Sequence, residues 1–239
     1  MILFPDLQND LDFQNIRNFK PREQLKEMDK FRKNINGKVG ILYCLRRTGK
    51  TVLLKQWLQN LQYEEQKKAV YILIDSENIC QVHHDLRILK ENGYKYIAID
   101  EITACEDFTN RAAPLSDNFA KSGMKIFIAG TDSLSLWLAI QDKLFDRAII
   151  FHMTYISFSE WSCIVYKQPL NDYIRYGCLL HLQPTLGEIQ HSVPIPWIED
   201  DMASYFNSSI ARNIQNSIFN YEVPLMMHNL SNFSLICVV

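Results

Sequence analysis

The feature that most constrains the fold is the alternation of short apolar runs with helical patterns between residues 38 and 154. Short apolar strands separated by helices are typical of a mostly parallel sheet that is covered by helices on both faces. The pattern therefore predicts an α/β fold. The predicted strands are residues 38–43, 69–76, 95–101, 125–131 and 148–154, and the predicted helices are residues 50–61, 81–92, a part of 107–121, and 134–140.

The regions outside this alternation have a different pattern. Residues 21–34, which open on Pro21, have the apolar spacing of an amphipathic surface helix. After residue 156 the pattern becomes mainly helical and is broken by a stretch with several prolines. We therefore expect three parts: an N-terminal helical segment (1–36), an α/β core (37–155) and a smaller helical subdomain (156–239).

A glycine-lysine-threonine triplet lies where the first predicted strand meets the first helix of the core. The stretch ILYCLRRTGKT, residues 41–51, nearly matches the phosphate-binding pattern G-x-x-x-x-G-K-[ST], with Cys44 at the first glycine. In such a loop, backbone N–H groups and a helix N-terminus converge on phosphate groups. Residues 44–51, called here the predicted phosphate loop, have the required strand before them and helix after them.

This geometry assigns a role to each residue type in the triplet. Lys50 would neutralise the β- and γ-phosphates, Thr51 would bind Mg²⁺ through its hydroxyl, and Gly49 would let the backbone close on the phosphate. Arg46 and Arg47 either contact phosphate or a partner, or form a structural ion pair. The expected nucleotide-binding residues are Arg46, Arg47, Thr48, Gly49, Lys50, Thr51 and Val52.

Two adjacent carboxylates follow the predicted strand YIAIDE. Asp100 and Glu101 would lie at the carboxyl end of that strand, which is the edge of an α/β sheet where ligands gather. In this Walker B arrangement the first carboxylate, Asp100, holds the Mg²⁺ shell, and the second, Glu101, polarises an attacking water. Asp75 ends another strand, but Ser76 rather than a second acid follows it.

Composition excludes several classes of protein. The formal net charge of −2 gives no overall attraction to nucleic acid or to anionic lipid. The six cysteines show no C-x-x-C spacing, so they indicate a reduced, cytoplasmic setting and no zinc site. The N-terminus lacks the pattern of a signal peptide, and no apolar stretch is long enough to span a membrane.

The motifs CLRRTGKTVLL, YIAIDEI, IFIAGTDS and ISFSEW resemble landmarks of AAA+-type P-loop ATPases related to the STAND branch, in a prokaryotic group with Gly-Leu-Arg-Arg-x-Gly-Lys-Thr. The likeness extends from about residue 21 to 219. It implies ATP as the ligand, a three-layer P-loop NTPase core with about five parallel strands, and a helical lid. The group usually continues further, so the resemblance implies a chain truncated at its C-terminus.

The resemblance also implies roles for residues outside the two main motifs. Thr131 and Ser133 resemble the sensor that hydrogen-bonds the γ-phosphate or the attacking water. Arg147 occupies the place where such ATPases present an arginine finger to a neighbour; the alternative for it is a surface ion pair. The resemblance leaves a homo-oligomer or another protein partner open. Arg22 and Glu23 resemble a pair that packs near the adenine.

Three functions are open at this stage. The first is a Mg²⁺-dependent AAA+-like ATPase that uses Glu101, Lys50, Thr131 and Arg147 in catalysis, with Thr51 and Asp100 at the metal. The second is a nucleotide-binding switch or protein-interaction module that binds ATP or ADP without hydrolysis, because Cys44 removes the conformational freedom of a glycine. The third, a nucleic-acid-binding module, is disfavoured by the charge balance.

Overall fold

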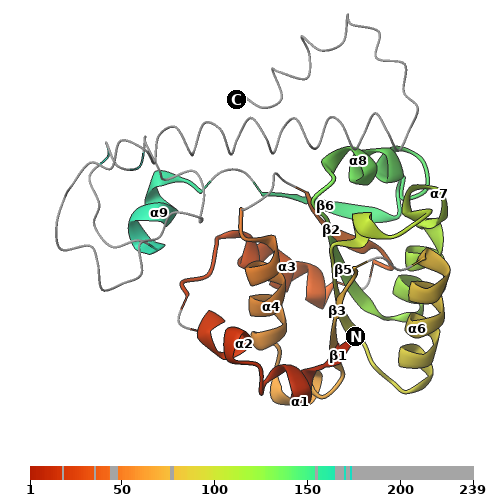
Figure 1. Cartoon of the computed structure of the whole chain (residues 1–239), viewed down its shortest axis with the longest axis horizontal. Helices are drawn as coiled ribbons and strands as arrows, with labels where there is room; N and C mark the ends of the chain where they lie inside the picture. The colour runs from red at the N-terminus through yellow and green to blue at the C-terminus, as the bar shows by residue number, and fades with distance from the viewer. Residues whose placement is uncertain are drawn as a thin grey trace, which may run out of the picture. The chain divides into compact units, whose positions relative to one another are not determined.

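The structure is a computed structural model of the whole chain (Figure 1). It describes residues 1–17, 19–34, 36–43, 48–75, 78–153 and 156–164, together with residues 170 and 173. The chain divides into two compact units, Met1–Val193 and Pro194–Val239, and every described residue belongs to the first unit. The fold below is that of this first unit.

A six-stranded sheet forms the centre of the described chain, in the order β1-β3-β4-β5-β2-β6. The five longer strands run parallel to one another, and only the two-residue β1 pairs antiparallel, with β3. Parallel strands end at the same edge, so the carboxyl ends of the neighbouring strands β4, β5 and β2 lie along one edge of the sheet. The strands are β1 (Ile2–Leu3), β2 (Val39–Tyr43), β3 (Ala69–Leu73), β4 (Tyr96–Asp100), β5 (Lys125–Ala129) and β6 (Ala148–His152).

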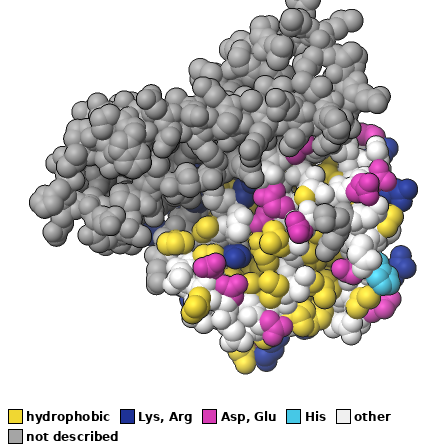
Figure 2. All heavy atoms as spheres, viewed as in Figure 1, with side chains coloured by type: hydrophobic (Ala, Val, Ile, Leu, Met, Phe, Trp, Pro, Cys, Tyr) yellow, Lys and Arg dark blue, Asp and Glu magenta, His cyan; other side chains and the backbone are white. Residues whose placement is uncertain are grey.

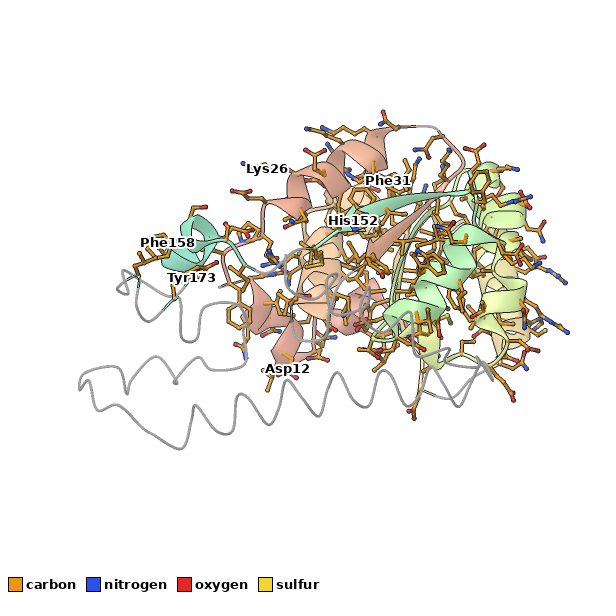
Figure 3. All side chains as sticks on the ribbon, turned by 90° about the horizontal axis from the view of Figure 1, so that it is seen from above. Asp12, Lys26, Phe31, His152, Phe158 and Tyr173 are labelled. Atoms are coloured by element: carbon orange, nitrogen blue, oxygen red, sulfur yellow. The ribbon has the colours of Figure 1, made fainter. Side chains whose placement is uncertain are left out.

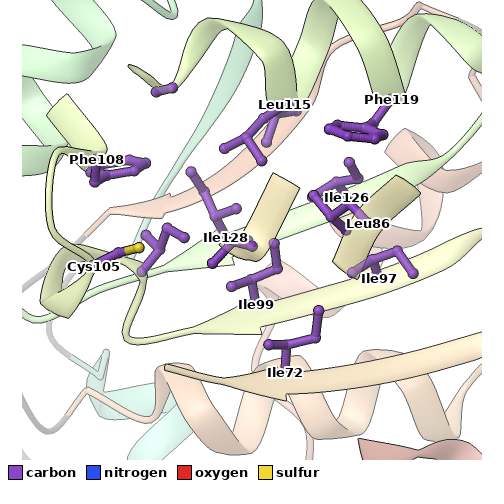
Figure 4. Packing of buried hydrophobic residues seen from close by; sticks show 14 of the residues in the cluster. Ile72, Leu86, Ile97, Ile99, Cys105, Phe108, Leu115, Phe119, Ile126 and Ile128 are labelled. Atoms are coloured by element: carbon purple, nitrogen blue, oxygen red, sulfur yellow. The ribbon is translucent and has the colours of Figure 1, made fainter. Parts of the chain in front are cut away.

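One face of the sheet is covered by helices from the middle of the chain. Alternate strand residues such as Ile97 and Ile99 pack there against Leu86 and Phe119 (Figure 4). Burial of these aliphatic side chains provides the main driving force for this layer. The elements with residues in this cluster are α6 (Ile79–Glu91), η1 (Ile102–Ala104), α7 (Phe108–Arg111), η2 (Leu115–Phe119), η3 (Ala120–Ser122) and α8 (Ser133–Gln141).

The opposite face is covered by helices from the N-terminal third. A second buried cluster joins these helices to the strand residues that point the other way, among them Ala98 and Phe127. The two clusters make a three-layer α/β fold, as the sequence predicted (Figure 1). The helices of this layer are α1 (Phe4–Leu7), α2 (Leu11–Ile16), α3 (Gln24–Lys33) and α4 (Lys50–Gln59); α5 (Tyr63–Gln66) follows α4.

Packed aromatic rings hold α3 and α4 against the sheet. The ring centroid of Phe127 lies 5.0 Å from that of Phe31, 4.8 Å from Trp57 and 5.2 Å from Phe151. Figure 3 shows Phe31 against the strands. A Cβ atom at Gly40 would lie 2.3 Å from the Phe127 ring, so the close packing requires glycine there. This layer fixes the position of α4, whose first turn begins at Lys50.

Beyond β6 the structure describes only a short segment. It contains α9 (Phe158–Ile164), whose first residue packs against Tyr173 with ring centroids 5.2 Å apart (Figure 3). The other helices predicted after residue 164 lie outside the described residues. Within the described part of the chain, no helix is both long and apolar enough to cross a membrane.

Candidate functional site

The described residues among those predicted to bind phosphate and metal meet at the carboxyl edge of the central strands. The predicted phosphate loop follows β2, Asp100 ends β4, and Thr131 follows β5, which lies between those two strands in the sheet. The edge therefore brings together segments that are about 30 to 80 residues apart in the sequence. This is the edge at which open α/β sheets bind ligands.

A left-handed glycine opens the helix at this edge. Gly49 has φ of 90° and ψ of 24°, a conformation that side chains other than that of glycine rarely adopt. Lys50 then begins α4, and its side chain is 5% exposed. The N-cap residue of α4 is Gly49, which has no side chain to cap the helix, and the positive end of the helix dipole lies here.

Asp100 is the central acceptor of the site. Its side chain is 1% exposed, and its Oδ2 accepts hydrogen bonds from Thr51 Oγ1 at 2.6 Å and from Tyr71 Oη at 2.9 Å. Its Oδ1 accepts a bond from the backbone N–H of Glu101 at 3.0 Å. The carboxylate is thus fixed in orientation, and it joins the first turn of α4 to the end of β4.

The hydroxyl of Tyr71 donates a hydrogen bond to the Asp100 carboxylate. Burial, followed by the nearby Asp100 charge and the hydrogen bond to it, raises the pKa of the phenol well above its usual range. The hydroxyl therefore keeps its proton under all ordinary conditions. Sequence reasoning missed Tyr71, because nothing in the strand pattern distinguishes it from the other apolar residues of β3.

Glu101 occupies an unusual backbone conformation beside Asp100. It has φ of 57° and ψ of 33°, in the left-handed region that a residue with a side chain seldom occupies. Such conformations cost free energy and are concentrated at functional sites. The turn places the Glu101 carboxylate next to Thr131, whose Oγ1 donates a hydrogen bond to Glu101 Oε2 at 2.9 Å.

Arg22 reaches the predicted phosphate loop from the N-terminal segment. Its Nη1 donates to the backbone carbonyl of Thr48 at 3.0 Å, and its Nη2 lies 3.0 Å from Glu160 Oε2. Both charged side chains are at most 8% exposed. Burial opposes ionisation of Glu160, but hydrogen bonds from Arg22 and from the backbone N–H of Glu23 lower the pKa of this carboxyl.

A comparison with protein families identifies the family of the chain. A family described as "AAA domain" matches residues 36–162, which is more than half of the chain. The chain belongs to the AAA-domain family. The match supports a nucleotide-binding role of the P-loop ATPase type and includes the predicted phosphate loop, Asp100, Glu101, Thr131 and Glu160. No curated protein matches the chain significantly.

Two solved structures resemble this AAA domain more distantly. One is PCH-2 of C. elegans, at 18% identity and a TM-score of 0.45. The other is the Thermotoga maritima RuvB Holliday junction branch migration motor, at 16% identity and a TM-score of 0.38. Each match covers 64% of this chain and 48% of the other, so the chain spans about half the length of these structures.

Arg147 lies away from the site just described. It directly precedes β6, at the amino edge of the parallel sheet, whereas Lys50 and Asp100 lie at the carboxyl edge. Its Nε is 2.9 Å from Asp117 Oδ2, and 38% of its side chain is exposed. The predicted role of Arg147 on a neighbouring subunit stays a prediction; within its own AAA domain it belongs to a surface ion pair.

The structure places the remaining predicted residues as follows. Val52 lies in the first turn of α4, half-buried, and Asp75 is exposed just after β3. Ser133 begins α8, but its side chain is outside the described part of the structure. Three predicted positions in the phosphate loop, Cys44, Arg46 and Arg47, lie outside the described residues, so the backbone conformation at Cys44 stays open.

The AAA-domain site offers the ligand types that Mg²⁺ prefers. Thr51 and Asp100 supply a hydroxyl and a carboxylate oxygen that already face one another, and Mg²⁺ selects hard oxygen ligands. Within the described ranges, no three His, Cys, Asp or Glu side chains cluster as a metal site of their own. The donor set fits a Mg²⁺ ion that takes its other ligands from nucleotide phosphates and water.

Proposed function

We propose that this chain is an ATP-binding AAA-type ATPase that hydrolyses ATP with Mg²⁺. The observation that carries the proposal is the hydrogen bond between Thr51 and Asp100 at the carboxyl edge of the sheet. Thr51 directly follows Lys50, the lysine of the predicted phosphate loop, and Asp100 is the first carboxylate of the pair Asp100 and Glu101. The hydrogen bond joins these two motifs. Both groups would then lie on the same Mg²⁺ ion when a nucleotide is bound.

Binding of the triphosphate would rest on the start of α4. The N–H groups of its first turn and the ammonium group of Lys50 supply positive charge at the place where the chain turns at Gly49. The low exposure of Lys50 strengthens its attraction to an anion, because water screens it poorly. Thr48 and Val52, on either side of this turn, would complete the described part of the binding segment.

Glu101 would act as the general base in hydrolysis. It is the acid next to Asp100, the proposed metal-holding carboxylate, and its Oε2 accepts a hydrogen bond from Thr131. A carboxylate held by one hydrogen bond keeps a second oxygen for a water molecule. The single O–H proton of Thr131 would orient either the carboxylate or, after leaving it, the γ-phosphate, and Mg²⁺ would stabilise charge on the phosphate oxygens.

A nucleotide-binding switch without turnover is the second candidate. Cys44 at the first glycine position favours it, and so does the Thr131 bond that engages one oxygen of the proposed base. A nucleic-acid-binding module has less support. On the face shown in Figure 2, the Lys and Arg side chains of the described residues are interspersed with Asp and Glu rather than gathered in one patch.

Two further proposals concern the oligomeric state of the protein and the division of the chain into parts. Arg147 could reach a phosphate only in a neighbouring protomer, after leaving Asp117, so a catalytic role for it requires a homo-oligomer. We retain the division into an ATPase core at 37–155 and a lid-like part at 156–239 as a proposal. We also propose a cytoplasmic location.

A phosphate-release assay on the wild type and on Glu101→Gln distinguishes the two main candidates. The ATPase proposal expects Mg²⁺-dependent turnover in the wild type and a loss of about 10²-fold to 10⁴-fold in the variant, because general-base catalysis contributes that much. Glu101→Gln should still bind ATP. Nucleotide binding without turnover in either protein would favour the switch.

A further inference from the structure

Three segments that are distant in the sequence meet at one carbonyl group of the predicted phosphate loop. The carbonyl oxygen of Thr48 accepts a hydrogen bond from Arg22 Nη1 at 3.0 Å. The same guanidinium donates to Glu160 through Nη2 at 3.0 Å and through Nε at 3.4 Å. The N-terminal segment, the loop before α4 and the segment after β6 are therefore joined by one side chain.

The bond to Thr48 constrains the direction of the next N–H group. A trans peptide is planar, and its C=O and N–H point in opposite directions. The described peptides are all trans, so an arginine that holds the Thr48 oxygen on one side directs the Gly49 N–H to the other side. The N–H of this residue is one of the groups that a phosphate loop aims at its ligand.

This peptide would be easy to turn without the arginine. Rotation of the Thr48–Gly49 peptide mainly changes ψ of Thr48 and φ of Gly49, and glycine accepts positive and negative φ about equally well. Gly49 lies at φ of 90° in the structure. The loop thus contains a hinge at Gly49, and the Arg22 bond is a contact that selects one orientation of it.

Glu160 in turn fixes the arginine. Its carboxylate also accepts the backbone N–H groups of Glu23 at 2.9 Å and of Ser157 at 3.4 Å. Because both charges are buried, separating the pair would leave an unpaired buried ion, which is strongly unfavourable. The position of Arg22 therefore depends on the segment that begins α9.

We propose that Arg22 and Glu160 are positioning residues that couple nucleotide binding to the docking of α9. Glu160 orients Arg22, Arg22 holds the Thr48 carbonyl, and the Gly49 N–H is thereby kept facing the phosphates. Coupling of this kind is reciprocal, so bound nucleotide stabilises α9 by the same factor as docked α9 strengthens nucleotide binding. This inference rests on the proposed binding of nucleotide at this loop.

Two variants and one control test the coupling. Glu160→Gln removes the charge that orients the arginine, and Arg22→Lys keeps the charge but loses the planar guanidinium group that donates to Thr48 and Glu160 together. Glu65→Gln is a matched control, because Glu65 also accepts from an arginine (Arg32), a backbone N–H (Gln62) and a further side chain (Tyr96), outside the loop. The double variant Arg22→Lys/Glu160→Gln completes the set.

The measurements are calorimetric titration with ATP and Mg²⁺, and hydrogen exchange of the α9 amides with and without that ligand. We expect each of the two single variants to bind about tenfold more weakly, the double variant to bind no more weakly than that, and Glu65→Gln to bind like the wild type. Nucleotide should slow exchange in α9 of the wild type, and should not do so in Glu160→Gln. A purely structural pair would not produce this ligand-dependent protection.

The outcomes separate this inference from the proposed function. If the wild type binds ATP and folded Arg22→Lys and Glu160→Gln bind it equally well, the coupling is wrong while the proposed function stands. If Glu65→Gln weakens binding as much as Glu160→Gln, the effect is one of general stability, and the coupling is again wrong. If the wild type binds no nucleotide, the proposed function fails, and the coupling fails with it.

Discussion

Thr131 Oγ1 donates a hydrogen bond to Glu101 Oε2 at 2.9 Å, across the gap between the ends of β5 and β4. Glu101 is in a left-handed conformation that costs free energy, so its side chain is directed by the turn and then held by this bond. The relationship gives the proposed general base a defined orientation.

Replacement of Thr131 by valine should impair turnover more than binding. Valine keeps the shape of the side chain and removes the hydroxyl that orients Glu101. We expect kcat for ATP to fall by about 10-fold to 100-fold, the usual effect of losing a group that orients a catalytic side chain, with little change in the dissociation constant. Rapid phosphate-release kinetics would measure it. A Thr131→Ser variant, which retains the hydroxyl, should keep most of the activity; equal losses in both would contradict this role.

The Thr51–Asp100 pair should govern the effect of Mg²⁺ on ATP affinity. Thr51→Ala and Asp100→Asn each remove one proposed metal ligand, so both should weaken ATP binding by about 10-fold to 100-fold in the presence of Mg²⁺ and change it little in EDTA. Calorimetry under the two conditions gives the comparison. Asp75→Asn, at an exposed position after β3, serves as a control that should leave both affinities unchanged. The assignment is wrong if the loss is the same with and without the ion.

Tyr71→Phe should alter the stability of the protein at high pH. The pKa of Tyr71 is higher in the folded protein than the usual value of about 10 for a tyrosine, so the folded state retains a proton that the unfolded chain loses above about pH 10. The contribution of this group to the free energy of unfolding is therefore complete below about pH 10 and decreases as pH rises further. We expect the variant to be about 1 kcal/mol less stable at neutral pH, with a shallower decline at alkaline pH. Urea unfolding between pH 7 and 11 would measure both, and parallel curves for the two proteins would contradict the prediction.

Arg147→Ala distinguishes a surface ion pair from a contact with a neighbouring subunit. The pair with Asp117 is partly exposed, so its loss should cost less than about 1 kcal/mol of stability. If Arg147 acts on a neighbouring subunit, the variant should lose turnover. Mixing it with Glu101→Gln should restore part of the turnover, because some sites in mixed assemblies then combine an intact Glu101 with an intact Arg147 from the neighbouring subunit. Titration of one inactive variant into the other is the measurement. No recovery, despite formation of mixed oligomers, would rule out this function of Arg147.

The parallel sheet was predictable because its strands are short apolar runs whose alternation with helices is visible in the sequence. Strand ends were less predictable. The strand predicted at residues 69–76 ends at Leu73 in the structure. Ile74 is buried although it lies beyond the strand, so the apolar run in the sequence extends past the end of strand pairing. The two-residue β1 was missed for a related reason, since two residues are too few to show a period.

Single positions in helices were harder to predict than the helices themselves. The pattern of apolar neighbours places both Trp57 and Trp137 in the core, and Trp57 is fully buried, but Trp137 on α8 is 47% exposed. The predicted helix within residues 107–121 is broken into α7, η2 and η3. Pro114, which has no N–H to donate, precedes η2 and contributes to the break.

The candidate site was predictable where a motif is local in the sequence, and unpredictable where it depends on contacts between distant segments. Lys50 and Thr51 are adjacent, as are Asp100 and Glu101, so strand ends and spacing were enough to propose them as candidates. The Arg22–Glu160 pair joins residues 138 positions apart. In the sequence the two residues lie in separate short motifs, Arg22-Glu23 and ISFSEW. Nothing in either motif predicts that they contact one another, so the pair is found only in the folded chain.

Calorimetric titration of ATP into the folded wild-type protein, with and without Mg²⁺, and into Lys50→Ala, is the most direct test of the central claim. We predict saturable binding at one site, tighter with Mg²⁺ than without it, and weakened by about 100-fold or more when the ammonium group at the start of α4 is removed. Absence of binding by a wild-type protein that is shown to be folded, or equal binding by Lys50→Ala, would contradict the claim that this edge of the sheet holds a nucleotide.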